Sequence, residues 1–310
     1  VYATVFVNTR GTDYLPGLLA LATTLADSEA TRPLVVLLVG PRSAAISRAA
    51  KCLNFTVASL NPIENVGPIR RRSAQARFND TFSKLYAFGM NAERVVLLDA
   101  DTLVLSNIDE LFRLPGSELA AVRDFGYACG NNRRCRSMFA QGEDFNSGVM
   151  VLRPSQDLFE QLYTERWSTD SNDGGDQGFL NAFFRARRTG GRGLPAEDTL
   201  PAKYNTFAQE ELLQAGFSVN KVSVLHYAGL KPWSGRANIG RESLQAFDAA
   251  MASYRRRCHA AQPALTDPER LFRDAVFQRR HSKGSGGRGG KGVNAGTRIH
   301  LRDMYAYGSQ

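Results

Sequence analysis

Short apolar runs and helical periodicities alternate along the first 260 residues of this chain. The runs at Ala3–Asn8, Leu34–Val39 and Phe55–Leu60 are typical of buried strands. Between them, apolar residues recur every three to four positions after Tyr14 and again over Ser43–Leu53, which predicts two helices. This alternation indicates an α/β fold with a mostly parallel central sheet of Rossmann type.

The same alternation continues beyond residue 80. Further strands are predicted at Val95–Leu98, Leu119–Val122, Phe145–Leu152 and Val222–His226. Helices are predicted at Thr81–Asn91, Asn107–Phe112, Ser155–Trp167, Gln177–Arg185, Arg241–Arg257 and Asp267–Phe277. Gly148 falls inside a predicted strand, which indicates either a bulge or a group that approaches the backbone closely.

Two carboxylates follow the most apolar of these strands. Val95–Leu98 leads directly into Asp99-Ala100-Asp101. Ligands of open α/β sheets bind at the carboxyl ends of the strands, and on an extended backbone Asp99 and Asp101 would point to the same side. Paired carboxylates suit a divalent cation such as Mn²⁺ or Mg²⁺, which in turn suits a diphosphate. The alternative is that the two aspartates only end a strand and open a turn.

Composition and charge divide the chain into a globular part and a tail. The 310 residues are 43% hydrophobic and 22% charged, which is ordinary for a globular protein. We therefore predict one domain over residues 1–278. Residues 279–310 are basic and rich in Gly and Arg, and we expect a flexible tail there. A tail of this kind can bind RNA or other polyanions, but a solvated linker is the commoner case.

Cysteines and sequons bear on the compartment. Cys129 and Cys135 flank a polar loop that a disulfide could close, whereas Cys52 and Cys258 need not pair. Two Asn-x-Thr sequons begin at Asn54 and Asn79. Together they favour a secretory or Golgi lumen over the cytoplasm. The chain begins at Val1 within a strand-like pattern, so we expect an N-terminal segment to precede it, and no apolar run approaches the ~18–20 residues of a membrane span.

Other polar residues lie where the predicted elements end. Lys84 is on the helix before the Asp99 strand, and His226 ends the last predicted strand. Asp173 could cap the helix that begins near Gln177, with Asp176 at its positive end. Arg70, Arg71 and Arg72 lie in a loop-like stretch that is either a solvated basic loop or a lid over an anionic substrate. Each residue alone has an ordinary structural interpretation.

In combination, four ordered motifs are more specific. Asp99-Ala-Asp101, Phe145-Asn-Ser-Gly148, Asp173-Gly-Gly-Asp-Gln-Gly178 and His226-Tyr-Ala-Gly-Leu-Lys-Pro-Trp233 resemble the retaining glycosyltransferases of family 8, in particular its glycogenin and galactinol synthase members. The resemblance covers about Ala3 to Trp233. It implies a GT-A fold, a UDP-sugar donor such as UDP-glucose or UDP-galactose, and Mn²⁺ as the cofactor, with Mg²⁺ as the alternative.

The resemblance also implies roles for residues. The metal would be bound by Asp99, Asp101 and His226. The donor nucleotide and diphosphate would be bound by Val7, Thr9, Tyr14, Lys84, Asp99, Ala100, Gly229 and Lys231. The donor sugar would be surrounded by the catalytic candidates Asn146, Asp176 and Gln177. Asp176 is the better nucleophile and Gln177 the better stabiliser; a covalent route and a front-face route both stay open.

The acceptor is not determined by these motifs. It could be a carbohydrate, a polyol, a lipid or a protein, and a homodimer is one oligomeric state to consider. In glycogenin-type members an acceptor tyrosine follows a Tyr-Asn pair, but here Tyr204-Asn205 is followed by no tyrosine up to Leu212. We therefore expect no self-glucosylation at that position. Two other functions stay open: a metal-dependent nucleotidyltransferase, and a non-enzymatic protein that binds RNA or other polyanions through its basic tail. For the transferase itself we expect no specific nucleic-acid partner.

Overall fold

The computed structural model describes residues 1–8, 14–66, 80–116, 118–124, 144–212, 217–234, 236 and 238–259. Residues Val1–Cys258 form one compact unit. The following predictions concern residues outside the described ranges: Thr9, the arginines 70–72, Asn79, Cys129, Cys135, the helix at 267–277 and the tail at 279–310.

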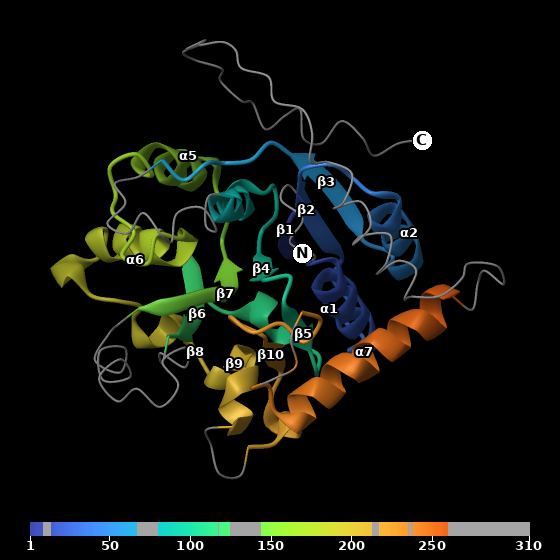
Figure 1. The fold of residues 1–310 in the computed structure, drawn as a ribbon. Coiled ribbons are helices and arrows are strands. Elements are labelled where there is room, and N and C mark those ends of the chain that lie inside the picture. Colours follow the sequence, from blue (N-terminus) through green and yellow to red (C-terminus); the bar gives the residue numbers. More distant parts are fainter. Residues whose placement is uncertain are drawn as a thin grey trace, which may run out of the picture. The chain divides into compact units, whose positions relative to one another are not determined.

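Among the described residues, a seven-stranded sheet forms the centre of the fold (Figure 1). Its order is β3-β2-β1-β4-β7-β6-β8, and β7 alone runs against its neighbours, so the sheet is mostly parallel as predicted. In that order the strands are Thr56–Leu60, Leu34–Val39, Tyr2–Val7, Val95–Leu98, Phe145–Leu152, Leu119–Arg123 and Thr199–Leu200.

A second, three-stranded sheet was not predicted. It has the order β5-β10-β9, formed by Thr102–Val104, Val224–His226 and Thr206–Phe207. Strands of two or three residues carry no measurable alternation, and their partners are distant in sequence: Thr102 pairs with His226. This sheet is therefore defined by contacts between residues distant in sequence and not by a local pattern.

Helices cover both faces of the large sheet. One face is covered by α1 (Leu15–Asp27) and α2 (Ala44–Leu53), whose apolar residues join β1 and β2 in one core. The other face is covered by the 3₁₀ helix η1 (Thr81–Gly89) and by α5 (Gln156–Glu165) and α6 (Asp176–Ala186). There aromatic rings pack in pairs, such as Phe82 with Phe179 and Tyr86 with Phe159.

Local sequence accounts for several of the helix ends. Pro16 lies in the first turn of α1, where its missing N–H costs nothing. Ser43 and Ser155 accept hydrogen bonds from Ile46 N (3.2 Å) and Leu158 N (3.1 Å) at the starts of α2 and α5. Asn54 ends α2 in the left-handed region with φ 55°.

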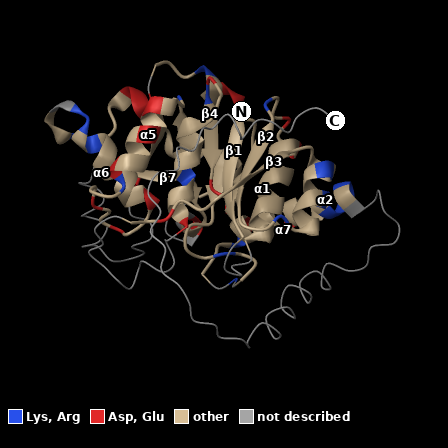
Figure 2. Cartoon of the chain, turned by 90° about the horizontal axis from the view of Figure 1, so that it is seen from above, with Lys and Arg blue, Asp and Glu red and all other residues tan. Residues whose placement is uncertain are grey.

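The surface charge of the helices differs, since α5 carries acidic and α2 basic residues (Figure 2).

The long helix α7 (Arg241–His259) completes the described part. Phe247 and Ala250 of α7 pack with Leu103 and Leu225 of the small sheet. Short 3₁₀ helices connect the remaining elements: η2 (Asp109–Arg113), η4 (Thr189–Gly191), η5 (Ala196–Asp198), η6 (Ala202–Tyr204), η7 (Ala208–Leu212) and η8 (Val219–Lys221). None of the described helices is both long and apolar enough to span a bilayer.

A disulfide joins Cys52 at the end of α2 to Cys258 at the end of α7, with 5.6 Å between the Cα atoms. This pairing was not predicted, because 206 positions separate the two cysteines. They meet because α7 returns to the α1 and α2 side of the sheet, where Arg257 also forms an ion pair with Asp27 of α1.

Candidate functional site

Strand order places the candidate residues at one edge of the large sheet. The chain runs from β1 outward to β2 and β3, whereas β4 lies on the opposite side of β1. In open α/β sheets this reversal leaves a crevice at the carboxyl ends of the two central strands. Val7 ends β1, and Asp99 follows β4, so both lie at that edge.

The Asp99-Ala100-Asp101 segment is a turn between β4 and β5, which corrects the prediction of an extended backbone. Thr102 N donates to Asp99 O at 3.1 Å, and Thr102 Oγ1 donates to the same oxygen at 2.8 Å. Backbone bonds from Asp99 N to Gly148 O (2.8 Å) and from Tyr227 N to Asp101 O (2.9 Å) anchor both ends of the turn. The carboxylates converge because of this anchoring and not because of strand alternation.

His226 completes a group of three ligands. One ligand atom each from Asp99, Asp101 and His226 lies within 4.8 Å of the other two. Asp101 and His226 are buried, and His226 Nε2 lies 3.4 Å from Asp101 Oδ1. Two carboxylates and an imidazole suit a divalent first-row cation, so the donor set fits the metal that the sequence motifs imply.

Lys231 neutralises Asp101. Its Nζ forms an ion pair with Asp101 Oδ2 and donates to Tyr227 O at 2.7 Å. Burial by itself raises the pKa of Asp101, but Lys231 and His226 outweigh it and hold that pKa well below the ordinary value. Burial likewise lowers the pKa of Lys231, but Asp101 outweighs it and the pKa rises. Both groups are therefore charged at neutral pH.

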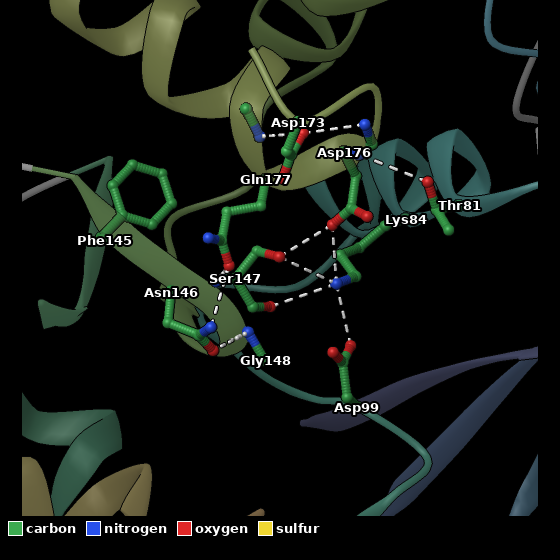
Figure 3. A network of polar contacts seen from close by, with 12 residues as sticks. Thr81, Lys84, Asp99, Phe145, Asn146, Ser147, Gly148, Asp173, Asp176 and Gln177 are labelled. Carbon is green, nitrogen blue, oxygen red and sulfur yellow. Dashed lines mark hydrogen bonds and ion pairs between the residues drawn. The ribbon is translucent and has the colours of Figure 1, made fainter. Parts of the chain in front are cut away.

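Lys84 is the centre of a second charged cluster (Figure 3). Its buried Nζ lies 2.7 Å from Asp176 Oδ2 and 2.9 Å from Asp99 Oδ1, and it donates to Ser147 Oγ at 3.2 Å. Burial tends to lower the pKa of Lys84, but Asp176 and Asp99 raise it above the ordinary value. Lys84 was predicted to face the donor; in this structure its ammonium bridges the metal-ligand group and the α6 N-terminus.

Two hydrogen-bonded residues fix the start of α6. Asp173 Oδ1 accepts from Gly175 N (2.8 Å) and Gly178 N (3.1 Å), so it satisfies free N–H groups of the first turn as predicted. Asp176 Oδ2 accepts from Ser147 Oγ at 2.8 Å, which ties the helix to β7 (Figure 3). Ser147 was not among the predicted site residues, although it lies between the predicted Asn146 and Gly148.

Gln177 and Asn146 hold each other in place. Gln177 Oε1 accepts from Asn146 Nδ2 at 2.9 Å and from Ser147 N at 3.1 Å (Figure 3). Gln177 Nε2 donates to Asp124 Oδ2 at 2.8 Å. Asp124 is another residue that the sequence analysis missed. Its position in the sequence could have indicated it. Asp124 directly follows β6, which runs in the same direction as β4, so it lies at the same edge of the sheet as Asp99.

Gly148 makes room for the histidine. A Cβ at this position would lie 2.3 Å from His226 Cε1, so no larger residue fits. The sequence indicated either a bulge or a close approach at Gly148, and the structure has both: the approaching group is the imidazole ring, and the pairing of β7 with β6 shifts register between Phe145 and Met150. The ring also packs edge-on against Phe207, with 5.2 Å between the ring centroids.

Tyr14 and the turn after β10 lie beside Asp101. The Lys231 ammonium lies 5.4 Å from the centre of the Tyr14 ring, and Tyr14 packs edge-on against Trp233. Burial raises the pKa of the Tyr14 phenol. Gly229 has φ +80°, a conformation that glycine adopts without strain. Of the residues predicted to bind the nucleotide, Tyr14 and Lys231 are thus brought close to Asp101. Gly17 of α1 packs on Ala100 O.

Comparisons with known proteins show which sequences and folds this chain is similar to. The sequence model of Glycosyl transferase family 8 matches residues 11–237. Human glycogenin-1 is 30% identical over 267 residues, which cover 84% of this chain and 67% of that protein. Inositol phosphorylceramide glucuronosyltransferase 1 of Arabidopsis thaliana is 29% identical over 243 residues, covering 72% and 41%. Glycogenin-1 of Caenorhabditis elegans is 36% identical over 165 residues, covering 51% and 34%.

The chain therefore spans between about a third and two thirds of the length of these relatives. Among solved structures, galactosyltransferase LgtC in complex with donor and acceptor sugar analogues matches with a TM-score of 0.58. The alignment covers 87% of this chain and 99% of LgtC at 17% identity, a likeness of fold.

Proposed function

The chain belongs to glycosyltransferase family 8, and from this premise we propose that it transfers a hexose from a UDP-sugar to an acceptor hydroxyl with retention of anomeric configuration. The observation that carries the proposal is the convergence of Asp99, Asp101 and His226 within 4.8 Å, next to Lys231. The relatives are not named for one common acceptor, so the donor diphosphate is the part of the reaction that we assign to this site first.

We assign the diphosphate to the Asp101 side of the site. A Mn²⁺ ion held by Asp99, Asp101 and His226 would supply positive charge to the leaving UDP. Lys231 adds an ammonium that Tyr227 O and the Tyr14 ring already hold in place. Negative charge on the leaving group grows as the glycosidic bond breaks, so a fixed cation there stabilises the transition state more than the ground state.

We assign the sugar to the Asp176 side. Asn146 and Gln177 have amide groups fixed by mutual hydrogen bonds, which suits recognition of sugar hydroxyls. Lys84 and Ser147 hold the Asp176 carboxylate, so it has a fixed position beside the predicted sugar. Asp176 as nucleophile and Gln177 as stabiliser remain the proposed catalytic pair, together with Asn146.

Three features support further parts of the proposal. Tyr204 is buried and donates to Glu110 at 2.8 Å, and no tyrosine follows in residues 205–212, so we infer that self-glucosylation does not occur there.

Asn54 and Thr56 of one sequon are exposed on a turn at the edge strand β3. With the Cys52–Cys258 disulfide, this exposure supports maturation in a secretory lumen. The test is to express wild type and Asn54→Gln in a secretory host and to measure their masses before and after glycosidase treatment. A mass that glycosidase removes from wild type and that Asn54→Gln lacks would support that location.

A ligand panel tests the proposed function. Thermal unfolding is measured with UDP, UDP-glucose, UDP-galactose, UDP-glucuronate and ATP, each with and without Mn²⁺. By linkage, a ligand at 100 times its Kd stabilises the fold by about 2.7 kcal/mol. The proposal predicts stabilisation by UDP and at least one UDP-sugar only when Mn²⁺ is present. Stabilisation by ATP in place of UDP would instead support a nucleotidyltransferase.

A further inference from the structure

Asn205 connects the two halves of the site. It lies between η6 and β9, its side chain is 3% exposed, and it contacts both His226 and Asn146. Its Oδ1 lies 2.8 Å from His226 Nδ1, and its Nδ2 donates to Asn146 Oδ1 at 2.7 Å. The motifs in the sequence gave this residue no role.

Backbone amides determine which way each amide side chain of this network points. Gly148 N, which can only donate, lies 2.9 Å from Asn146, so the facing atom of Asn146 is its oxygen. Ser147 N lies 3.1 Å from Gln177, so the facing atom of Gln177 is also oxygen, which matches a donating Asn146 Nδ2. Two independent backbone donors therefore give the same orientation of Asn146.

The orientation of Asn146 determines that of Asn205. Because Asn146 presents an oxygen, Asn205 must present its NH₂ group there, and its own oxygen faces His226 Nδ1. Two acceptors 2.8 Å apart would repel, so the neutral imidazole carries its proton on Nδ1. The lone pair of Nε2 is then free and directed at the Asp101 side of the site.

We propose that Asn205 is a positioning residue that holds His226 in the tautomer required for metal binding through Nε2. This inference rests on the proposed metal site, but the tautomer itself does not depend on sugar transfer. Asp101 Oδ1 competes, since it would accept a proton from Nε2, but that contact is 3.4 Å, longer than the 2.8 Å contact to Asn205. Gly148 and Phe207 confine the ring, so it cannot turn over to exchange its nitrogens freely.

Two substitutions separate the two hydrogen bonds of Asn205. Asn205→Leu keeps the approximate volume and removes both bonds. Asn205→Asp keeps an oxygen toward His226 Nδ1, replaces the donor to Asn146 by an acceptor oxygen and adds a negative charge. We therefore expect the His226 proton to move to Nε2 in Asn205→Leu and to stay on Nδ1 in Asn205→Asp.

Nitrogen-15 NMR of the metal-free full chain at about pH 9, where imidazole is neutral, reads the tautomer directly. The His226 signal is assigned by its loss in His226→Gln. Titration with Mn²⁺ alone, followed by electron paramagnetic resonance, gives the metal affinity. The expected loss of affinity in Asn205→Leu is about 10- to 100-fold, the usual effect of removing a partner of a ligating histidine. Asn205→Asp should stay within a few-fold of wild type.

Asn181→Leu is the matched control. Asn181 is also buried, and it bonds the backbone of Phe145 on the same strand β7 through 2.9 Å and 2.8 Å contacts. Its replacement should lower stability and leave the tautomer and Mn²⁺ affinity unchanged. A wild-type proton on Nε2, or an Asn205→Leu variant that binds Mn²⁺ as wild type does, would overturn the inference. If transfer activity is absent and the tautomer behaves as expected, the proposed function fails and the inference stands.

Discussion

Lys231 contacts three groups at once: the Asp101 carboxylate, the Tyr227 carbonyl and the face of Tyr14. An ammonium held by this many partners loses little entropy when a phosphate approaches. Its ion pair with Asp101 distinguishes it from Asn146 and Gln177, whose amide groups bond each other. Lys231 should therefore act on the leaving group and not on the choice of sugar.

Lys231→Ala tests this assignment. We expect kcat to fall by on the order of 10²-fold, the scale for removing one preorganised charge stabiliser, with a similar factor for UDP-glucose and UDP-galactose. The measurement is kcat and KM with both donors, and exposed Lys221→Ala of η8 is the matched control, which should keep wild-type kcat. An altered donor preference at unchanged kcat would place Lys231 in the sugar pocket instead.

Most of the site's residues could be predicted from their types and order, but their contacts could not. Asp99, Asp101 and His226 were predicted as metal ligands, and the structure brings them together. The bond from Lys84 to Asp176 was not predicted, because nothing in the sequence relates a residue of η1 to the first residue of α6. Asp124, Ser147 and Asn205 share this problem: their importance comes from neighbours that are distant in sequence.

At the scale of elements, the Asp109 carboxylate ties η2 to β1 and to Thr31. Asp109 Oδ1 accepts from Tyr2 OH of β1 at 2.7 Å, and Asp109 Oδ2 accepts from Thr31 N at 2.9 Å and Thr31 Oγ1 at 2.6 Å. Burial tends to raise the pKa of Asp109, but the bonds from Thr31 and Tyr2 outweigh it and lower that pKa below the ordinary value. The folded state is thus stabilised by the ionised carboxylate.

Asp109→Asn should lower the free energy of unfolding at pH 7 by about 1–2 kcal/mol, as expected for hydrogen bonds to a charged group. A pKa that is lower in the folded chain contributes stability above the unfolded-state pKa near 4 and loses it as the pH falls below that value. The difference between variant and wild type should therefore shrink between pH 5 and pH 3. Urea unfolding at these pH values measures it. Glu93→Gln, which removes an exposed carboxylate, is the control. A difference that is independent of pH, or one that this control reproduces, would contradict this account.

Helices and long strands were predicted well because their periodicity extends over many residues. The β2 strand and the β7 strand have the predicted bounds, and α1 has the predicted apolar face. The segment from Asp99 to Asp101 was predicted wrongly as extended. The β4 strand ends at Leu98, and the turn that follows is held because Asp99 N donates to Gly148 O and Tyr227 N donates to Asp101 O. Such long-range bonds override the local pattern.

At the scale of the whole molecule, the Cys52–Cys258 disulfide closes a loop between two residues 206 positions apart, with β1, α1 and β2 outside it. A cross-link over a long loop restricts the unfolded state more than a short one. The helices that it joins, α2 and α7, carry none of the candidate site residues. The bridge should therefore affect stability and leave catalysis at ambient temperature intact.

Replacing both Cys52 and Cys258 by Ser should lower the free energy of unfolding by about 2–4 kcal/mol. Denaturant unfolding and kcat are measured on the same preparations, and the double variant Cys129→Ser/Cys135→Ser shows what a second disulfide there would contribute. Wild type treated with a reductant should unfold as the Cys52/Cys258 variant does. Equal stability of this variant and untreated wild type would show that the bridge does not form.

The class and the central sheet of the molecule were predictable, because alternating strands and helices leave few topologies for a parallel sheet. The small sheet, the disulfide and the packing of α7 were not, since each depends on the return of the chain after residue 200. The domain limits at residues 278 and 279 stay predictions, as does the role of the tail.

The central claim is that Asp101 binds a metal ion that UDP release requires. The most direct measurement is UDP release from a UDP-sugar as a function of Mn²⁺ concentration, in wild type and Asp101→Asn, with circular dichroism to verify the fold. The amide keeps the shape of the side chain and removes the charge that holds a hard cation. The account predicts Mn²⁺-dependent release in wild type and background release in Asp101→Asn at every Mn²⁺ concentration. Wild-type release by a folded Asp101→Asn variant at low Mn²⁺ would contradict it.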